Sequence, residues 1–275
     1  MSDRITEQPF CQTRVMCMAV DNLELLLSQP DESVDLIYCD ILYGTGRNFG
    51  DYQDLKPVRS EIESHYLPRL IEMKRVLKST GSIYLQMDTR INHWMRILMD
   101  DVFGYDKYLN EIIWVYDLAD NSKTNYPKKH DCILFYKKGK EHTFNCNDIR
   151  IDYDSATKKR YNGTKVGRGN KTELNVLGKV PNNVWRDIDI QRNNNVYATQ
   201  KPKALIERII KASSNEGDTV ADYYLGSGTT AVVCKELNRN FIGCDINPKA
   251  IEITNARLDN VSAHFCQTRV IRCLF

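Results

Sequence analysis

Short apolar and aromatic runs alternate with stretches of helical periodicity along most of the chain. The run Val34–Cys39 is apolar almost throughout, whereas Ser60–Leu77 repeats apolar residues at three- and four-residue spacing. Apolar strands separated by amphipathic helices are typical of an α/β fold with a mostly parallel, helix-covered sheet. The predicted strands are Arg14–Val20, Val34–Cys39, Gly81–Met87, Glu111–Tyr116, Asp131–Tyr136, Thr219–Tyr223 and Phe241–Cys244. The predicted helices are Asn22–Ser28, Ser60–Leu77, Lys203–Ala212 and Gly228–Leu237.

The stretch 145–195 interrupts this pattern. It is rich in Asn, Asp, Lys, Arg and Gly, and its periodicity is weak, so we interpret it as an insertion or a small subdomain. The charge distribution points to the same region. The chain has 38 Lys and Arg against 36 Asp and Glu, but residues 121–200 hold 16 basic and 8 acidic residues, a net charge of +8. The remainder, with 22 basic and 28 acidic residues, is mildly acidic.

Composition narrows the class of protein. The length of 275 residues allows one large α/β domain, with or without a smaller insertion. The apolar runs, such as Ile112–Val115, fall far short of the roughly 18 residues that a membrane span needs, and no secretory signal pattern opens the chain. The nine cysteines are odd in number and form no C-x-x-C pair, so disulfides and a zinc site are not expected. We therefore expect a cytoplasmic protein.

The strongest motif follows the predicted strand that ends near Asp222. There the chain reads D-Y-Y-L-G-S-G-T-T, so that a strand runs into a Gly-Ser-Gly turn that opens a helix. Glycines let the backbone pass close to a ligand, and a helix N-terminus offers free N–H groups. About twenty residues further, a second strand ends at Asp245, where a carboxylate can accept hydrogen bonds from ribose hydroxyls. Because neither G-x-G-x-x-G nor G-K-[ST] is present, the pattern favours a nucleoside-containing cofactor over a dinucleotide or a triphosphate. A lone Gly-x-Gly would otherwise be an ordinary tight turn.

A second candidate site follows the strand Val34–Cys39. The sequence D-I-L-Y-G there brings an acid, Asp40, and an aromatic ring, Tyr43, to the carboxyl edge of the sheet. A carboxylate can accept a hydrogen bond from an exocyclic amino group while a phenol ring stacks on the same flat base. Taken alone, D-x-x-Y could equally be a strand end with a solvated acid and a tyrosine on the rim.

Together, the two motifs resemble those of the β group of amino-methylating DNA methyltransferases, the N6-adenine and N4-cytosine family that includes type III-like modification enzymes. The segment from Asp40 to Tyr43 is similar to their D-P-P-Y motif, and Asp222–Thr230 is similar to their S-adenosylmethionine motif, D-x-F-x-G-S-G-T-T. Thr199–Pro202 resembles the T-Q-K-P that precedes it. The likeness covers residues 12–258. It implies a Rossmann-like S-adenosylmethionine-dependent methyltransferase sheet with an inserted basic target-recognition region.

The resemblance also implies a role for individual residues. The expected activity is site-specific transfer of a methyl group from S-adenosylmethionine to the N6-amino group of adenine in duplex DNA. Asp40 and the carbonyl of Ile41 would accept the two amino hydrogens, and Tyr43 would stack on the flipped base. The residues assigned to the cofactor are Asp21, Lys201, Pro202, Asp222, Tyr224, Gly226, Ser227, Gly228, Thr229 and Asp245. The residues assigned to DNA are Lys123, Lys128, Lys129, Lys158, Lys159, Arg160, Lys165 and Arg168, for which a solvated loop is the ordinary alternative.

Two departures from the family pattern leave alternatives open. Ile41 and Leu42 replace the two prolines, which removes two fixed φ angles and adds two backbone donors, and Tyr224 replaces the usual phenylalanine. A DNA-binding relative without activity is therefore one alternative. Methylation of cytosine N4 is another, although Asp40 favours adenine because N4 enzymes of the family commonly have Ser there. Methylation of a small molecule or a protein amide would leave the basic segment without a purpose.

The resemblance also suggests how the chain is divided. We expect a catalytic half in residues 1–120, the last sheet strands and the target-recognition insertion in 121–198, a cofactor-binding half in 199–260, and a tail in 261–275. Besides duplex DNA, a restriction subunit and a second copy of the chain are candidate partners. No metal site is predicted.

A hexapeptide is repeated near the two ends of the chain. Phe-Cys-Gln-Thr-Arg-Val occurs at residues 10–15 and again at 265–270. A recent duplication is the plainer explanation. The alternative hypothesis is that Phe265–Phe275 competes for the position of the first strand, or pairs with that strand across a dimer.

Overall fold

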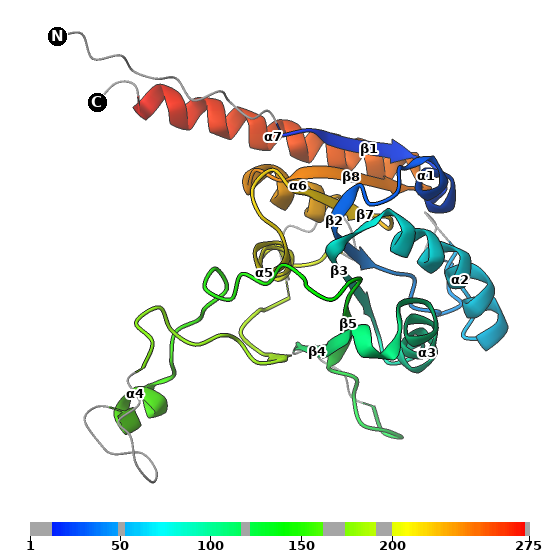
Figure 1. Ribbon diagram of the computed structural model, residues 1–275, viewed down its shortest axis with the longest axis horizontal. Coiled ribbons are helices and arrows are strands. Elements are labelled where there is room, and N and C mark those ends of the chain that lie inside the picture. The colour runs from blue at the N-terminus through cyan, green and yellow to red at the C-terminus, as the bar shows by residue number, and fades with distance from the viewer. Residues whose placement is uncertain (1–12, 49–52, 117–121, 162–173, 191–199, 273–275) are drawn as a thin grey trace.

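The computed structural model describes residues 13–48, 53–116, 122–161, 174–190 and 200–272 (Figure 1). Its strands form one eight-stranded sheet in the order β1-β8-β7-β2-β3-β5-β4-β6. The strands are β1 (Val15–Ala19), β2 (Val34–Asp40), β3 (Leu77–Met87), β4 (Tyr108–Val115), β5 (His130–Lys137), β6 (Val184–Trp185), β7 (Thr219–Asp222) and β8 (Asn240–Asp245). The helices are α1 (Asn22–Ser28), α2 (Arg59–Val76), α3 (Asn92–Phe103), α4 (Ser155–Tyr161), α5 (Lys203–Ser213), α6 (Thr229–Glu236) and α7 (Pro248–Arg272), with a short 3₁₀ turn at Tyr105–Lys107.

The sheet is mostly parallel, as predicted. Every neighbouring pair from β1 to β3 runs in the same direction, and β5 alone runs against its neighbours β3 and β4. The reversed β5 begins beside the end of β3, so that Cys132 pairs with Met87. Residues at the start of β5 therefore lie at the same sheet edge as the carboxyl ends of β2 and β3.

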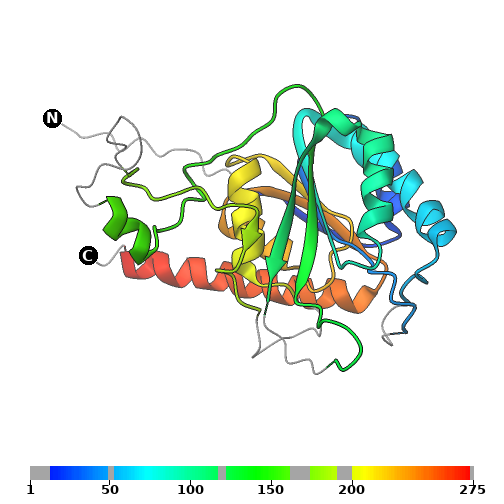
Figure 2. The ribbon, with the colours of Figure 1, turned by 90° about the horizontal axis from the view of Figure 1, so that it is seen from below.

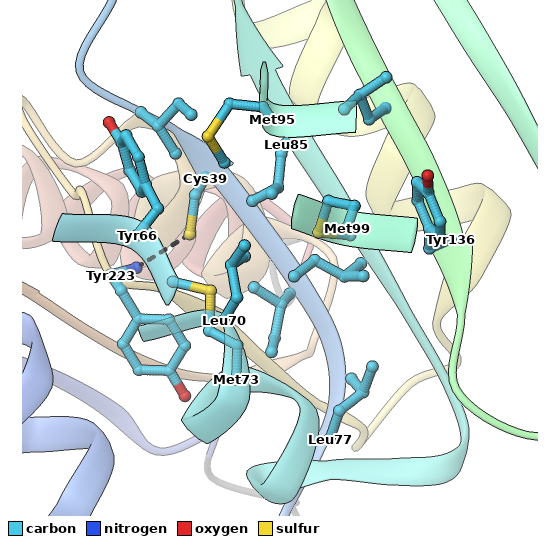
Figure 3. Close-up of a cluster of buried hydrophobic side chains, with 14 of the residues drawn as sticks. Cys39, Tyr66, Leu70, Met73, Leu77, Leu85, Met95, Met99, Tyr136 and Tyr223 are labelled. Carbon is cyan, nitrogen blue, oxygen red and sulfur yellow. Dashed lines mark hydrogen bonds between the residues drawn. The ribbon is translucent and has the colours of Figure 1, made fainter. Parts of the chain in front are cut away.

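The sheet has a hydrophobic core on each face, which explains why its central strands are apolar on both sides. In β2, Ile37 and Cys39 pack among α1, α2 and α3, whereas Leu36 and Tyr38 pack among α5, α6 and α7. Figure 3 shows part of the first core, where Tyr66, Leu70 and other side chains of α2 and α3 lie against the strands. The two helical layers on opposite sides of the sheet are visible in Figures 1 and 2.

Several elements differ from those predicted. α3, α4, α7 and β6 were not predicted, and β3 begins at Leu77, before the expected Gly81. α3 had a readable signal, because Met95, Leu98 and Met99 lie at helical spacing and are buried. α7 had a weak one, because its apolar residues do not keep to one face.

After β5, the chain leaves the sheet and forms α4 away from it (Figure 1). We call this segment, residues 138–183, the excursion. The chain returns through β6, which pairs with β4 at the edge of the sheet. Sheet strands thus come from each of the three larger segments expected from the sequence. No helix in the described part of the chain is long and apolar enough to cross a membrane.

The two copies of the repeated hexapeptide have different structures. Val15, the last residue of the first copy, opens β1 and pairs with Phe241 of β8. The second copy lies within α7, a helix that extends beyond the sheet and runs across the expected boundary at residue 260 (Figures 1 and 2). The second copy is therefore not a strand in this structure, and the first strand's position is taken by β1 itself.

Candidate active site

The two sequence motifs leave the sheet side by side. β2, which ends at Asp40, and β7, which ends at Asp222, are paired parallel strands, with Leu36 opposite Val220 and Ile37 opposite Ala221. The segments that follow β2 and β7 therefore leave the sheet at the same edge. Ligand sites in open α/β sheets form at this edge.

Asp40 is held by two side chains. The Tyr43 hydroxyl lies 2.8 Å from Asp40 Oδ1, and Lys201 Nζ donates to Asp40 Oδ2 at 2.6 Å. The same Tyr43 hydroxyl lies 2.8 Å from Oδ2 of Asp131, at the start of β5. The Lys201 ammonium is also 5.2 Å from the centre of the Tyr43 ring. Two carboxylates, one phenol and one ammonium thus form a single cluster.

Asp131 accepts further hydrogen bonds from neighbouring strands. Gln86 Nε2 of β3 donates to it at 2.9 Å, and the Tyr116 hydroxyl, just after β4, donates at 3.0 Å. The Gln86 amide is oriented in turn by the Tyr38 hydroxyl, which donates to its Oε1 at 2.8 Å. This network is carried by four adjacent strands, so the sheet itself fixes its geometry.

Burial and charge act in opposite directions on this cluster. Burial raises the pKa of Asp40, and the Lys201 ammonium opposes that rise and favours the carboxylate. Burial lowers the pKa of Lys201, but the carboxylates of Asp40 and Asp131 raise it, and the net direction is upward. Burial and the two acids raise the pKa of Tyr43 well above its usual value, so its hydroxyl remains protonated.

The segment from Asp40 to Tyr43, called the tetrapeptide below, lacks the two prolines of the family motif, and hydrogen bonds fix its backbone instead. The Ile41 N–H, which a proline would lack, donates to the carbonyl of Gln86 at 3.1 Å and so prolongs the pairing of β2 with β3. The carbonyl of Leu42 accepts from the Tyr66 hydroxyl at 2.8 Å. One of the two added donors is therefore used, and the backbone on both sides of the Ile41 carbonyl is anchored.

The loop after Tyr43 is organised by Asp54. Its buried carboxylate accepts from the backbone N–H groups of Gly44 at 3.1 Å, Thr45 at 2.7 Å and Leu55 at 2.8 Å. The Thr45 hydroxyl adds a further bond at 2.5 Å. One side chain thus closes the loop that follows the aromatic residue.

The glycine turn requires its glycines for two reasons. Gly226 and Gly228 have φ angles of +53° and +76°, a region that other residues rarely adopt. A Cβ on Gly228 would lie 2.3 Å from Thr254 Oγ1 of α7, whereas a Cβ on Gly226 would meet nothing within 4 Å. Gly226 therefore faces open space on the side where a ligand could approach.

Asp222 supports the turn from within. It is 2% exposed, and its carboxylate accepts from the Thr230 hydroxyl at 2.6 Å and from the Tyr224 N–H at 3.0 Å. Burial raises the pKa of Asp222 to about 7. Thr229 is buried beside it at the start of α6. Asp222 thus supports the backbone of the turn.

Asp245 links the end of β8 to the same turn. Its Oδ2 accepts from the Gly226 N–H at 2.9 Å, and its Oδ1 accepts from the Asn247 N–H at 2.9 Å. Burial raises the pKa of Asp245. Arg257 of α7 braces the other side by donating to the Ser227 carbonyl at 2.5 Å.

Asp21 and Tyr224 belong to a network that also includes Arg69 and His65 of α2. Asp21 caps α1 through the Leu23 N–H and pairs with Arg69 of α2 at 3.0 Å. The Tyr224 hydroxyl, which the usual phenylalanine lacks, lies 3.0 Å from Nε2 of His65. Burial lowers the pKa of His65 to about 4, so the ring is neutral at pH 7.

Lys201 and Pro202 lie just before α5. Pro202 is buried at the N-terminus of α5, and Lys201 contacts the Asp40 carboxylate. The family resemblance assigned both residues to the cofactor, and that assignment stays a prediction. The structure adds the contact between Lys201 and Asp40, which the resemblance did not include.

The residues assigned to DNA lie mainly in two places. Lys123, Lys128 and Lys129 lie between β4 and β5, and Lys158, Lys159 and Arg160 lie on α4, where all three are exposed. The expected contacts at 165 and 168 lie outside the described residues. The structure thus brings the first group to the same end of β5 as Asp131 and places the second on the excursion.

Sequence reasoning missed the side chains that support the motifs. Gln86, Asp131, Asp54, Arg69 and Arg257 were not assigned a role. Only Asp131 had a local signal, since an acid opens an otherwise apolar strand. The others are polar residues within ordinary helices, strands and loops, and only folding shows what they contact.

Comparison with known proteins gives a consistent family. A family model described as DNA methylase, for N6 and N4 methyltransferases, matches residues 34–256. The type II methyltransferase M.HpaI of Haemophilus parainfluenzae is 37% identical over 253 residues, which cover 90% of this chain and 74% of that protein. The DNA adenine methyltransferase YhdJ of Escherichia coli is 34% identical, covering 89% of this chain and 82% of that protein.

A solved structure shows the same fold. The cytosine-N4-specific PvuII DNA methyltransferase superposes with a TM-score of 0.66 and covers 92% of this chain and 91% of its own. Its sequence identity is 16%, so this likeness concerns the fold alone.

Proposed function

The chain belongs to the N6 and N4 family of DNA methylases, and on that premise we propose that it methylates the N6-amino group of adenine in duplex DNA. S-adenosylmethionine is the methyl donor of this family. The observation that carries the proposal is the position of Asp40, which ends β2 directly beside the glycine turn that follows β7. A carboxylate there can draw an amino group toward a methyl donor held by the turn.

The residues around the glycine turn fit a nucleoside with a positively charged sulfur. Gly226 leaves its Cβ side open, and the carboxylate of Asp245 can accept further hydrogen bonds from ribose hydroxyls. Beside it, Nδ2 of Asn247 is buried and has no hydrogen-bond partner among the described residues. An unsatisfied buried donor at this point is well suited to an acceptor atom of the ligand. S-adenosylmethionine, when bound, supplies an electrophilic methyl group.

The residues of the chain then have distinct tasks. An aromatic amine is a poor nucleophile because its lone pair is delocalised into the ring. Acceptors at its two N–H bonds, the Asp40 carboxylate and the Ile41 carbonyl, draw density back to nitrogen and stabilise the positive charge that develops there. Tyr43 stacks on the base and offsets part of the few kcal/mol that flipping costs. Lys201 opposes the rise in the pKa of Asp40 that burial causes and so favours its ionised form.

The basic residues supply the contact to DNA. Lys158, Lys159 and Arg160 lie exposed on the excursion, away from the sheet, where phosphate contacts would not compete with the catalytic carboxylates. Binding through these residues should weaken steeply with added salt, because each neutralised phosphate releases counterions. A salt-independent affinity would count against this role.

The test is transfer of a labelled methyl group to unmethylated mixed-sequence duplex DNA, followed by nucleoside analysis. The wild-type protein should produce N6-methyladenine, and Asp40→Ala should not. Asp35→Ala is the matched control, because Asp35 lies on the same strand and pairs with Lys78 at 2.8 Å, and it should retain transfer.

Two other results would redirect the proposal. N4-methylcytosine as the product would assign the chain to the other branch of its family, to which the PvuII enzyme belongs by its description. Absence of transfer despite binding of S-adenosylmethionine and DNA would indicate an inactive relative. In that case, replacing Ile41 and Leu42 by Pro-Pro should create activity.

A further inference from the structure

Asp131 is a second carboxylate in the candidate active site, and the sequence motifs give it no role. It is 4% exposed and is the second residue of β5, before an apolar stretch that begins at Cys132. Three neutral donors contact it, from Tyr43, Tyr116 and Gln86. Among the ion pairs of the described residues, none includes Asp131, whereas Asp40 has Lys201. Asp131 can therefore take up a proton without breaking an ion pair of its own.

The Tyr43 hydroxyl connects the two acids but has one proton for both. Its oxygen lies 2.8 Å from Asp40 Oδ1 and 2.8 Å from Asp131 Oδ2. With both acids ionised, one of these contacts lacks a hydrogen. If the Tyr43 proton points to Asp131, then Asp40 Oδ1 is free to accept a hydrogen from the substrate amine. If one further proton enters, both contacts become hydrogen bonds. The cluster is thus one proton short of full satisfaction.

From this geometry we propose that Asp131 takes up the proton released by methyl transfer, through the Tyr43 hydroxyl. The inference rests on the proposed function, because Asp40 must face the substrate amine. The nitrogen lone pair forms the new bond to the methyl carbon, and the carbon–sulfur bond breaks with its electrons remaining on sulfur. The nitrogen then loses a proton to Asp40. Asp40 passes that proton to the Tyr43 oxygen as the phenolic proton moves to Asp131.

The cluster favours this direction of transfer. Lys201 lies 2.6 Å from Asp40 and stabilises its ionised form, so the proton does not remain there. Asp131 loses no ion pair on protonation. After the transfer, Asp40 and Tyr43 have returned to their starting states and Asp131 alone is neutral. Asp131 is thus a positioning and proton-accepting residue that acts through Tyr43.

The experiment measures single-turnover methyl transfer by enzyme already bound to S-adenosylmethionine and DNA, between pH 6 and pH 9. Asp131→Asn should slow transfer about 100-fold. Tyr43→Phe, which keeps the stacking ring, should slow it by a similar factor, and the double variant should be no slower than the slower single variant. Because Asp131→Asn removes the group that takes up the proton, the dependence of the rate on pH should also differ from that of the wild-type protein.

Asp100→Asn is the matched control. Asp100 accepts a hydrogen bond from the Tyr136 hydroxyl at 2.6 Å, away from the site, and its replacement should leave the rate profile unchanged. The inference would be overturned if Asp131→Asn and Tyr43→Phe both kept the wild-type rate and pH profile. It would also be overturned if the double variant lost the product of the two single fold-losses in rate. If Asp131→Asn does not fold, Tyr43→Phe decides, and a full rate there overturns the inference. Absence of transfer by the wild-type protein would refute the proposed function instead.

Discussion

The loop from Asp40 to Tyr43 and the glycine turn leave neighbouring strands at the same sheet edge, yet they constrain their own sequences differently. Both receive contacts from far along the chain: Asp245 and Arg257 contact the turn, and Lys201, 161 positions away, contacts Asp40. The turn also has two residues at positive φ, which only glycine adopts readily. A turn with such a backbone needs a strict sequence, whereas a loop held by distant side chains can change its own sequence.

This difference explains how the tetrapeptide keeps its place without prolines. A proline fixes φ from within the loop. Here Gln86, Tyr66 and Asp54 fix the loop from outside, through bonds to its backbone. In the glycine turn, no outside contact can replace Gly228, because its φ angle and the contact with Thr254 both exclude a side chain.

The largest effect is expected from Lys201→Met, which breaks the distant support of the loop. It leaves Asp40 partly buried without a cation, at a cost of about 3 kcal/mol in the free energy of unfolding. Because Lys201 lowers the pKa of Asp40, its loss should raise that pKa. Methyl transfer needs the ionised acid, so the acid limb of the rate profile should move to higher pH. Urea unfolding and rate profiles measure both effects.

The matched control is Lys203→Met, which breaks a more exposed pair with Glu236 and should cost less than about 1 kcal/mol. Equal losses in the two variants would contradict the prediction.

Gly228→Ala should have the next largest effect, because it alters the turn itself. Strain at positive φ and the contact with Thr254 together should cost about 2 to 3 kcal/mol of stability and weaken binding of S-adenosylmethionine. Gly217→Ala separates the two causes, since Gly217 has a φ of +84° but open space around its Cβ position. Gly217→Ala should therefore cost only the strain, about 1 kcal/mol, without changing ligand binding. Calorimetric titration and urea unfolding provide the measurements.

Asp222→Asn should change how stability depends on pH. The folded pKa of Asp222 is raised to about 7, above the usual 3.8, so the folded state holds its proton after the unfolded state has lost it. The contribution of Asp222 to stability is therefore fully present below about pH 4 and declines as the pH rises toward 7. Asn does not titrate, so the variant should gain on the order of 2 kcal/mol relative to wild type between pH 4 and pH 7. Urea unfolding across this range measures the difference. Parallel curves would show that Asp222 titrates normally.

Tyr224→Phe should have the smallest effect. It restores the phenylalanine of the family motif and removes the 3.0 Å hydrogen bond to His65. The loss should be about 1 kcal/mol or less, and binding of S-adenosylmethionine should be unchanged, because the ring remains in place. A large loss of affinity would show that the hydroxyl itself contacts the ligand.

Much of the fold could be predicted from local pattern. The predicted strands correspond to strands of the structure, because an apolar run such as Val34–Cys39 has few options other than the centre of a sheet. The element most clearly missed was α7, whose apolar residues do not keep to one face. The end of α2 was less predictable, because Leu77 continues the helical spacing but pairs with Val34 at the start of β3.

The sequence by itself determined the family and the cofactor class, and it predicted the roles of Asp40, Tyr43 and the glycine turn. It could do so because motif residues lie within a few positions of one another and meet through local geometry. Only the tertiary structure decided that Lys201 pairs with Asp40 and that Asp131 shares the Tyr43 hydroxyl. These contacts depend on strand order and direction, above all on the reversed β5, which brings its first residues to the end of β3. The spacing of residues along the chain does not predict the pairing of β5 with β3.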